Sequence, residues 1–309
     1  MTFGIHSSGH YRNYMNTHTD RLTRFHLPAA HVRGAVVHLG ETWATVQSRA
    51  DYPAPVRALL GEALAASALF ASILKTDGRL SIQIRGTQGL RTLFAECTAQ
   101  GTLRGIARVV EDDPLPTDLT QLGEGAVLAL TLESPPRANG EPHRYQGLVP
   151  IESPHLSGAF EDYFRQSEQL PTRLLLAADG ERCAGLLLQV MPGSNDAEDW
   201  NRANALFETL GQKELLETEA ATLLHRLFHE ESPEILAEQP LAFACSCSRE
   251  RIEEVFESLG REEAMASVID GQAEVVCEFC GKAYAFSPEQ LSHLFERQNA
   301  TVALPDSVQ

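Results

Sequence analysis

Four cysteines near the C-terminal end constrain this chain more than any other feature. They form two close pairs, Cys245-x-Cys247 and Cys277-x-x-Cys280, with a spacer between the pairs that is long enough to fold. Each pair places two thiolates on a short turn, and the spacer lets both turns meet around one tetrahedral Zn²⁺ at about 2.3 Å per Zn–S bond. Gly281 directly after the second pair suits a turn that aims both sulfurs the same way. The spacing therefore predicts one zinc site formed by these four cysteines.

The first pair differs from most structural zinc ribbons, which use two C-x-x-C turns. A disulfide within the C-x-C pair would close a small ring, and strained disulfides are readily reduced. A four-thiolate site is also electron-rich, so that an oxidant can convert the thiols and release the metal. Spacing alone leaves two interpretations open: a closed structural site that only holds a small domain together, and a redox switch.

The cysteine stretch resembles the C-terminal zinc centre of the heat-shock protein 33 family, the redox-regulated holdase chaperones of bacteria. The paired motifs of that family are matched by CSCSRER at 245–251 and by CEFCG at 277–281. The similarity extends over about 30–286, most of the chain. The upstream segments that carry it are GRLSIQ at 78–83, RGIARV at 104–109, EDYF at 161–164, SEQLPT at 167–172 and GLLLQVMP at 185–192.

The resemblance implies a chaperone that needs no ATP, binds unfolding client proteins under oxidative stress, and is no enzyme. It would be inactive when reduced and zinc-loaded. On oxidation, disulfides Cys245–Cys247 and Cys277–Cys280 would form, zinc would leave, and the small domain and the preceding linker would unfold. The family also implies that the active form is a homodimer.

Two functions of other classes remain as alternatives. One is a zinc-ribbon adaptor that binds a single folded partner permanently. The other is a thiol–disulfide oxidoreductase that uses Cys277 and Cys280. A thioredoxin-like βαβ pattern does not precede this second pair, which argues against the oxidoreductase.

Composition excludes some partners. The formal net charge is −17, from 25 basic and 42 acidic residues, so the chain has no excess of cations for a nucleic acid to bind. The apolar run at 63–74 is interrupted by serine and is shorter than a membrane span. The first residues are polar and lack the apolar core of a signal peptide, so we expect a cytoplasmic protein with no membrane partner.

The pattern of elements predicts an α+β fold. A long helix after Pro53 and Pro55 precedes a series of short strands separated by Gly, Asp, Asn and Pro, as in an antiparallel meander. We expect five parts. They are a flexible N-terminal tail (1–28), an α+β core of antiparallel strands with packed helices (29–191), an acidic helical linker (192–240), a zinc-binding redox-switch domain (241–296) and a C-terminal tail (297–309).

The expected linker is acidic, yet apolar residues recur at helical spacing between Leu215 and Phe228. Such a helix repels itself and depends on a docking surface for its stability. Whether it is docked permanently or reversibly does not follow from composition. The remaining cysteines, Cys97 and Cys183, are single thiols on expected strands, where cysteine usually serves as a small buried hydrophobe.

Overall fold

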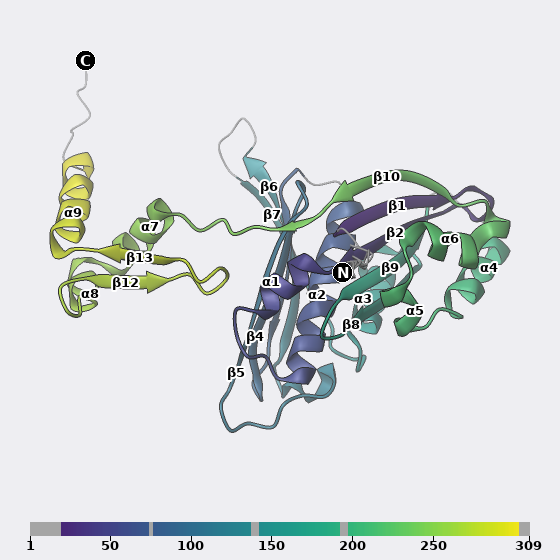
Figure 1. The fold of residues 1–309 in the computed structure, drawn as a ribbon, viewed down its shortest axis with the longest axis horizontal. Helices are drawn as coiled ribbons and strands as arrows, with labels where there is room; N and C mark the ends of the chain where they lie inside the picture. The colour runs from purple at the N-terminus through teal and green to yellow at the C-terminus, as the bar shows by residue number, and fades with distance from the viewer. Residues whose placement is uncertain (1–19, 74–76, 137–141, 192–196, 303–309) are drawn as a thin grey trace, which may run out of the picture.

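A computed structural model describes residues 20–73, 77–136, 142–191 and 197–302, and Figure 1 shows that they form a large lobe and a small C-terminal lobe. The large lobe contains two sheets. One has five antiparallel strands in the order β10-β1-β2-β9-β8, and the other has six strands in the order β11-β5-β4-β3-β6-β7. The strands of the large lobe are β1 (Arg21–Leu27), β2 (Val32–Leu39), β3 (Arg79–Arg85), β4 (Leu90–Thr98), β5 (Thr102–Val109), β6 (Val127–Pro136), β7 (Pro142–Val149), β8 (Thr172–Ala178), β9 (Cys183–Val190), β10 (Glu234–Pro240) and β11 (Ala242–Phe243).

Helices connect and cover these sheets. Together with short turns, they are η1 (Pro28–Ala30), α1 (Glu41–Gln47), α2 (Ala54–Ile73), η2 (Leu119–Leu122), α3 (Leu156–Tyr163), η3 (Phe164–Glu168), α4 (Ala197–Phe207), α5 (Gln212–Glu217), α6 (Ala220–Phe228) and η4 (His229–Glu231). The predicted α+β class is confirmed. All pairings between strands are antiparallel except that of the short β11 with β5.

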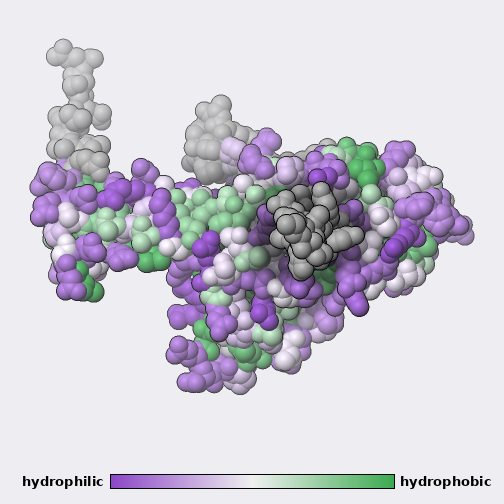
Figure 2. All heavy atoms as spheres, in the orientation of Figure 1, coloured by the Kyte–Doolittle hydropathy of each residue, from purple (hydrophilic) through white to green (hydrophobic). Residues whose placement is uncertain are grey.

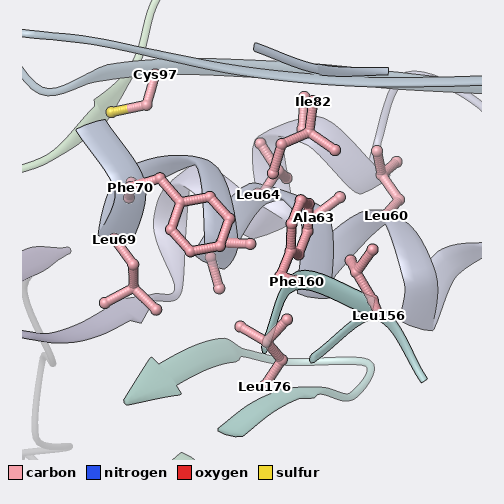
Figure 3. Close-up of a cluster of buried hydrophobic side chains, with 14 of the residues drawn as sticks. Leu60, Ala63, Leu64, Leu69, Phe70, Ile82, Cys97, Leu156, Phe160 and Leu176 are labelled. Atoms are coloured by element: carbon pink, nitrogen blue, oxygen red, sulfur yellow. The ribbon is translucent and has the colours of Figure 1, made fainter. Parts of the chain in front are cut away.

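Helix α2 lies between the two sheets and organises the core of the large lobe. Pro55 is tolerated because it lies in the first turn, where its missing N–H has no partner to lose. Ala63, Leu64 and Phe70 are fully buried, and side chains of α2 point to strands on both sides of it (Figure 3). By length and composition α2 could cross a bilayer, but most of it is buried inside the protein, as expected of a core helix.

The five-stranded sheet is covered on both faces. Strand β9 reads CAGLLLQV and is buried along nearly its whole length, whereas a strand with one wet face would alternate. One face packs on α2. The other is covered by the segment α4–α6, whose buried side chains form a second cluster with Phe25, Val36 and Leu186. Phe228 of α6 stacks on Phe25 with ring centroids 6.3 Å apart.

The six-stranded sheet packs only one face on α2. In β3 the residues alternate, with Leu80, Ile82 and Ile84 buried and the intervening polar residues only partly covered. Its outer face therefore carries mainly polar and charged side chains. Those include Arg79 and Gln83 of β3 and Glu96 of β4.

Two expectations about the ends of the large lobe are wrong. The tail predicted for 1–28 lies outside the described residues up to position 19, but Arg21–Leu27 is strand β1, between β10 and β2. The linker predicted as helical ends in a strand, since β10 pairs with β1 over Arg21↔Pro240 to His26↔Glu234. Strand β10 pairs with a strand more than 200 residues away in the sequence, whereas β1 also pairs with the neighbouring β2.

The small lobe comprises α7 (Arg249–Leu259), α8 (Arg261–Ala266), β12 (Ala273–Val276), β13 (Ala283–Phe286) and α9 (Pro288–Val302). Its core is small and centres on Phe256, Tyr284 and Phe286. Val255 and Leu259 of α7 are apolar but about half exposed, at 51% and 50%. Helix α9 also continues beyond 296, where the C-terminal tail was predicted to begin.

Candidate metal centre

Two short loops carry the four paired cysteines. Cys245 and Cys247 follow β11 on an extended segment, which ends where Ser248 caps α7 by accepting a hydrogen bond from the backbone N–H of Arg251 at 3.3 Å. Cys277 and Cys280 lie in the tight loop between β12 and β13. That loop is closed by hydrogen bonds from the N–H of Gly281 to the carbonyl of Cys277 (2.7 Å) and from the N–H of Cys277 to the carbonyl of Lys282 (2.9 Å).

Gly281 has a backbone φ of +71°, in the left-handed region that favours glycine. The turn that follows the second pair therefore requires this residue, as its place in the sequence suggested. The loop from Cys277 to Gly281 is referred to below as the knuckle.

The sulfur atoms lie where a tetrahedral ion would need them. All four Sγ atoms are within 4.8 Å of one another, with Cys245–Cys277 at 3.6 Å and Cys247–Cys280 at 3.4 Å. A tetrahedron with Zn–S bonds of about 2.3 Å has edges of about 3.8 Å, so the cluster matches a zinc-sized site with small adjustments. It is the one group of three or more potential metal ligands found among the described residues.

Hydrogen bonding distinguishes the four thiols. Burial acts to raise the pKa of Cys247, but the Tyr284 hydroxyl, which donates to its Sγ at 3.2 Å, and the neighbouring thiols lower that pKa to about 7. Burial and the other thiols raise the pKa of Cys280 to about 12, and burial also raises that of Cys245. Cys247 therefore carries negative charge more readily than Cys245 or Cys280.

The sequence analysis gave Tyr284 no role at the site. Its hydroxyl reaches Cys247 because Tyr284 is on the buried side of β13, in the alternation Tyr284, Phe286. Such outer contacts orient ligands and tune their basicity. A tyrosine at the first inward position of the strand after the second pair was the available signal.

The two single cysteines differ from the four of the cluster in that both are buried in the core. Cys97 is buried among the side chains of α2 and the six-stranded sheet (Figure 3), and burial raises its pKa to about 12. Cys183 is completely buried, and burial raises its thiol pKa well above the ordinary value. Both keep their thiols protonated and inaccessible, as expected of cysteines that serve as small hydrophobes.

The acidic residues near the EDYF segment hold the fold together. The carboxylate of Glu161 accepts a hydrogen bond from the backbone N–H of Leu174 at 2.7 Å and pairs with Arg173, which ties α3 to β8. A cavity of 380 Å³ is lined by Glu161 and Arg173 and by Trp200 and Asn204 of α4. These partners account for the carboxylate without a catalytic role.

Both cysteine loops are connected to the six-stranded sheet of the large lobe. Strand β11, just before Cys245, pairs with β5 of the six-stranded sheet. The knuckle touches the outer face of the same sheet: the Phe279 ring lies edge-on to Phe94 at 5.7 Å, and the Arg104 guanidinium lies 4.6 Å from the centre of the Phe279 ring. Glu278 forms an ion pair with Arg108.

Comparison with known proteins gives consistent results. A family profile described as "Hsp33 protein" matches residues 20–287. Proteins named "33 kDa chaperonin" are 45% identical over 284 residues in Hahella chejuensis, spanning 90% of this chain and 97% of the relative, and 40% identical over 282 residues in Chromobacterium violaceum, spanning 90% and 95%. The crystal structure of the 33 kDa chaperonin from Thermotoga maritima superposes with a TM-score of 0.75 at 22% identity. That match spans 92% of this chain and all of the other, and it supports the fold.

Proposed function

The chain belongs to the Hsp33 family of chaperones, and on that premise we propose that it is a redox-regulated holdase that binds unfolding proteins without ATP. The observation that carries the proposal is the cluster of four half-buried thiols in a lobe with little hydrophobic core of its own. The proposed parts are the linker at 192–240 and the switch domain at 241–296, attached to a core that extends from strand β1 to 191.

We assign Zn²⁺ as the metal, one ion per chain, bound by Cys245, Cys247, Cys277 and Cys280. The donor set supports zinc because four thiolates at tetrahedral spacing suit this ion, whereas calcium and magnesium prefer oxygen. Bound zinc would hold the two cysteine loops together and so supply folding free energy to the small lobe.

A peroxide can supply the oxidising equivalents for the proposed chemistry. Each pair of thiolates would lose two electrons to form one S–S bond, and one hydrogen peroxide molecule would take up those electrons and two protons from the solvent to become two water molecules. With both pairs oxidised, none of the four sulfurs remains a thiolate donor.

We propose that the disulfides form within pairs, Cys245 with Cys247 and Cys277 with Cys280. In the folded cluster, sulfurs of different pairs also lie close, at 3.4 and 3.6 Å. Once the small lobe loosens, only thiols adjacent in the chain are certain to remain near each other. Peptide mapping of the oxidised protein tests this, and predominant Cys247–Cys277 or other cross-pair bonds would contradict it.

Strand β10 is the segment through which loosening would reach the linker. It lies at the edge of the five-stranded sheet and is mostly exposed, with Ile235 and Leu236 at 46% and 62%, so backbone hydrogen bonds to β1 are its main attachment. β11 and Cys245 follow immediately. If the switch domain becomes disordered, the chain after β10 no longer anchors this strand, and only its pairing with β1 holds it. Segment α4–α6 can then leave the apolar face that it covers.

Client proteins are the proposed partners, bound on the surface that the linker uncovers, with a homodimer as the oxidised form and the cytoplasm as the compartment. The net charge of −17 supports client proteins as the partners, because it disfavours binding of nucleic acid. It would also keep the protein soluble while apolar surface is exposed. We propose no catalytic residue, since in the described part of the chain the cysteines Cys277 and Cys280 lie in a β-hairpin loop rather than in a thioredoxin-like βαβ unit.

The test is suppression of aggregation of a thermally unfolding protein, measured by light scattering, with and without peroxide, alongside zinc release to a chromophoric chelator. We expect suppression only after oxidation, together with release of one zinc per chain. The variant with Cys97→Ser and Cys183→Ser should behave as the parent. Zinc release without suppression favours the permanent adaptor, and catalytic reduction of a substrate disulfide favours the oxidoreductase.

A further inference from the structure

The tip of the knuckle rests on a defined place on the outer face of the six-stranded sheet. Phe279 lies edge-on to Phe94, with the rings at 74°, and beneath the guanidinium of Arg104. Beside it, Glu278 pairs with Arg108. Figure 1 shows the loop between β12 and β13 directed toward the large lobe. An aromatic ring and a neighbouring carboxylate of one segment are therefore received together by two adjacent strands, β4 and β5.

The guanidinium of Arg104 is held in place by the buried carboxylate of Glu96. The Nε of Arg104 donates to Oε1 of Glu96 at 2.9 Å, and the Glu96 carboxylate is buried in the sheet face, with Arg79 also 3.7 Å from it. Glu96 and Arg104 are directly opposite each other across β4 and β5. This fixes the guanidinium plane over the position that Phe279 occupies. Phe94, Arg104 and Arg108 are referred to below as the aromatic seat.

We infer that the aromatic seat is a binding site for an aromatic side chain flanked by a carboxylate on an unfolded client segment, and that Glu278–Phe279 occupies it in the folded switch domain. The inference rests on the proposed function, which supplies the clients, and it adds a chemical preference to their recognition. Arg108 makes the seat selective, since it attracts an acidic neighbour and repels a lysine. Figure 2 shows pale green, mildly apolar residues along the stretch that joins the lobes.

The position of Phe279 depends on the cysteine cluster. It lies between Cys277 and Cys280, in the loop that the Gly281 and Cys277 backbone hydrogen bonds close. While the loop is folded, Phe279 competes for the seat at an effective concentration on the order of millimolar. When the switch domain unfolds, that advantage falls and the seat becomes available to clients. Oxidation would therefore uncover a second surface, separate from the one beneath the linker.

The first test uses reduced, zinc-loaded protein and no oxidant. The variant Glu278→Ala with Phe279→Ala removes the occupant and keeps all four cysteines. The probe is a hexapeptide, Gly-Ser-Glu-Phe-Ser-Gly, with 4-fluorophenylalanine in place of Phe, followed by its ¹⁹F signal. We expect the peptide to bind the variant at least about tenfold more tightly than the parent, from the ring contacts that it now replaces. The matched control, Glu274→Ala with Val276→Ala, changes exposed residues of the same hairpin and should bind as the parent does.

A charge reversal tests the chemistry of the seat. Arg108 is exposed, so Arg108→Glu should leave the fold intact. Added to the Glu278→Ala, Phe279→Ala variant, it should weaken the Glu-Phe peptide about two- to fivefold and strengthen a Lys-Phe peptide by a similar factor. Equal binding by parent and double variant, or no effect of Arg108→Glu on the preference, would overturn the inference.

If the double variant fails to retain zinc, the same two peptides are compared on oxidised parent and oxidised Arg108→Glu protein. We expect the same reversal of preference there, and its absence overturns the inference. The outcomes are separate from those of the proposed function. A chain that binds the peptide but never suppresses aggregation loses the holdase role and keeps the seat, whereas a holdase with no peptide preference loses only the seat.

Discussion

The two lobes differ in what holds them together. In the large lobe, Phe70 is fully enclosed between two sheets and contacts Phe160 and Phe164 edge-on at 4.7 and 5.2 Å. In the small lobe, Val255, Leu259, Ile269 and Val276 remain 50–73% exposed. Hydrophobic burial can stabilise the first lobe alone, but a domain of the second kind commonly needs a metal. If the cysteine cluster holds zinc as proposed, loss of that ion would unfold the small lobe and leave the large lobe folded.

The linker lies between these extremes. Helix α6 is short, and isolated helices of its length are marginal in water, so its stability comes from docking Leu223, Leu224, Leu227 and Phe228 on the five-stranded sheet. The sheet itself stays folded through α2 on its other face. The docked segment can therefore leave without unfolding the surface that it covers.

The largest expected effect is removal of the metal under reducing conditions. Structural zinc supplies roughly 10–16 kcal/mol to small metal-binding domains, far more than the core of the small lobe offers. We expect a strong chelator to abolish hydrogen-exchange protection in β12 and β13, while amides of α2 stay protected. The control is protein with Cys97→Ser and Cys183→Ser. Before the chelator is added, it should contain as much zinc as the parent. Persistent protection of β12 and β13 in the metal-free protein would remove the basis of the comparison.

The next effect concerns docking of the linker. Leu223→Asp with Leu227→Asp forfeits roughly 1.5–3 kcal/mol of burial per side chain, before the cost of placing a carboxylate on an apolar face. We expect this variant to suppress client aggregation while reduced and zinc-loaded, with loss of hydrogen-exchange protection in α4–α6. The matched control is Ala221→Asp with Thr222→Asp, which adds the same charge to the exposed side of α6.

If protection in α4–α6 is lost and aggregation is still not suppressed, masking by the linker is wrong. If α4–α6 remain protected in the variant with Leu223→Asp and Leu227→Asp, the docking free energy exceeds the contribution of these two leucines. The linker is then a stable part of the large lobe.

Much of the large lobe follows from local pattern. The apolar patterns of three segments predict strands, and the structure has strands with the same bounds, at Val32–Leu39, Arg79–Arg85 and Thr172–Ala178. The strands that were missed, β1 and β10, depend on each other across most of the chain. In β1, Arg24 and His26 alternate with the buried Phe25 and Leu27, and β1 pairs with the nearby β2, so this segment carries a local strand signal. In β10 the acidic residues continue the composition of the linker, and its partner β1 lies across most of the chain, so no local signal marks this strand.

The candidate metal centre was likewise predictable from the sequence only in part. The spacing of the cysteines was enough to predict that they meet, because ligands on two tight turns need only a foldable spacer. The contacts that connect the cluster to its surroundings were not predictable. Tyr284 reaches Cys247 through the register of β12 with β13, and Phe279 reaches Phe94 because the two lobes pack together.

A smaller effect is expected inside the large lobe, from Glu62 on α2. Burial raises the pKa of this carboxyl to about 7, and Asp118 and His155 line the same 140 Å³ cavity. The folded state therefore keeps a proton that the unfolded state loses above about pH 4.5. Stability should fall as pH rises from about 4.5 to about 7, by roughly 2–3 kcal/mol.

Thermal or urea unfolding of the large lobe at pH 5 and pH 8 measures this term. Glu62→Gln cannot ionise, so the difference between the two pH values should shrink by roughly that amount, while zinc content stays unchanged. An unaltered pH dependence in Glu62→Gln would show that Glu62 is ionised in the folded protein. In that case the pH response of the large lobe has another source.

The smallest effect tests how finely the small lobe is tuned. Tyr284→Phe keeps the ring in the core of that lobe and removes the hydroxyl that donates to the Sγ of Cys247. Outer hydrogen bonds of this kind are worth about tenfold or more in metal affinity, so we expect zinc to bind about tenfold more weakly and to be released faster by peroxide. Competition with a chelator of known affinity measures the first, and chromophoric zinc release the second. Tyr145→Phe in the large lobe, which loses a hydroxyl contact with Tyr163 at 3.2 Å, is the control and should change neither. If Tyr284→Phe binds zinc as tightly as the parent, the four sulfurs alone set the affinity, and the small lobe depends on its ligands rather than on their surroundings.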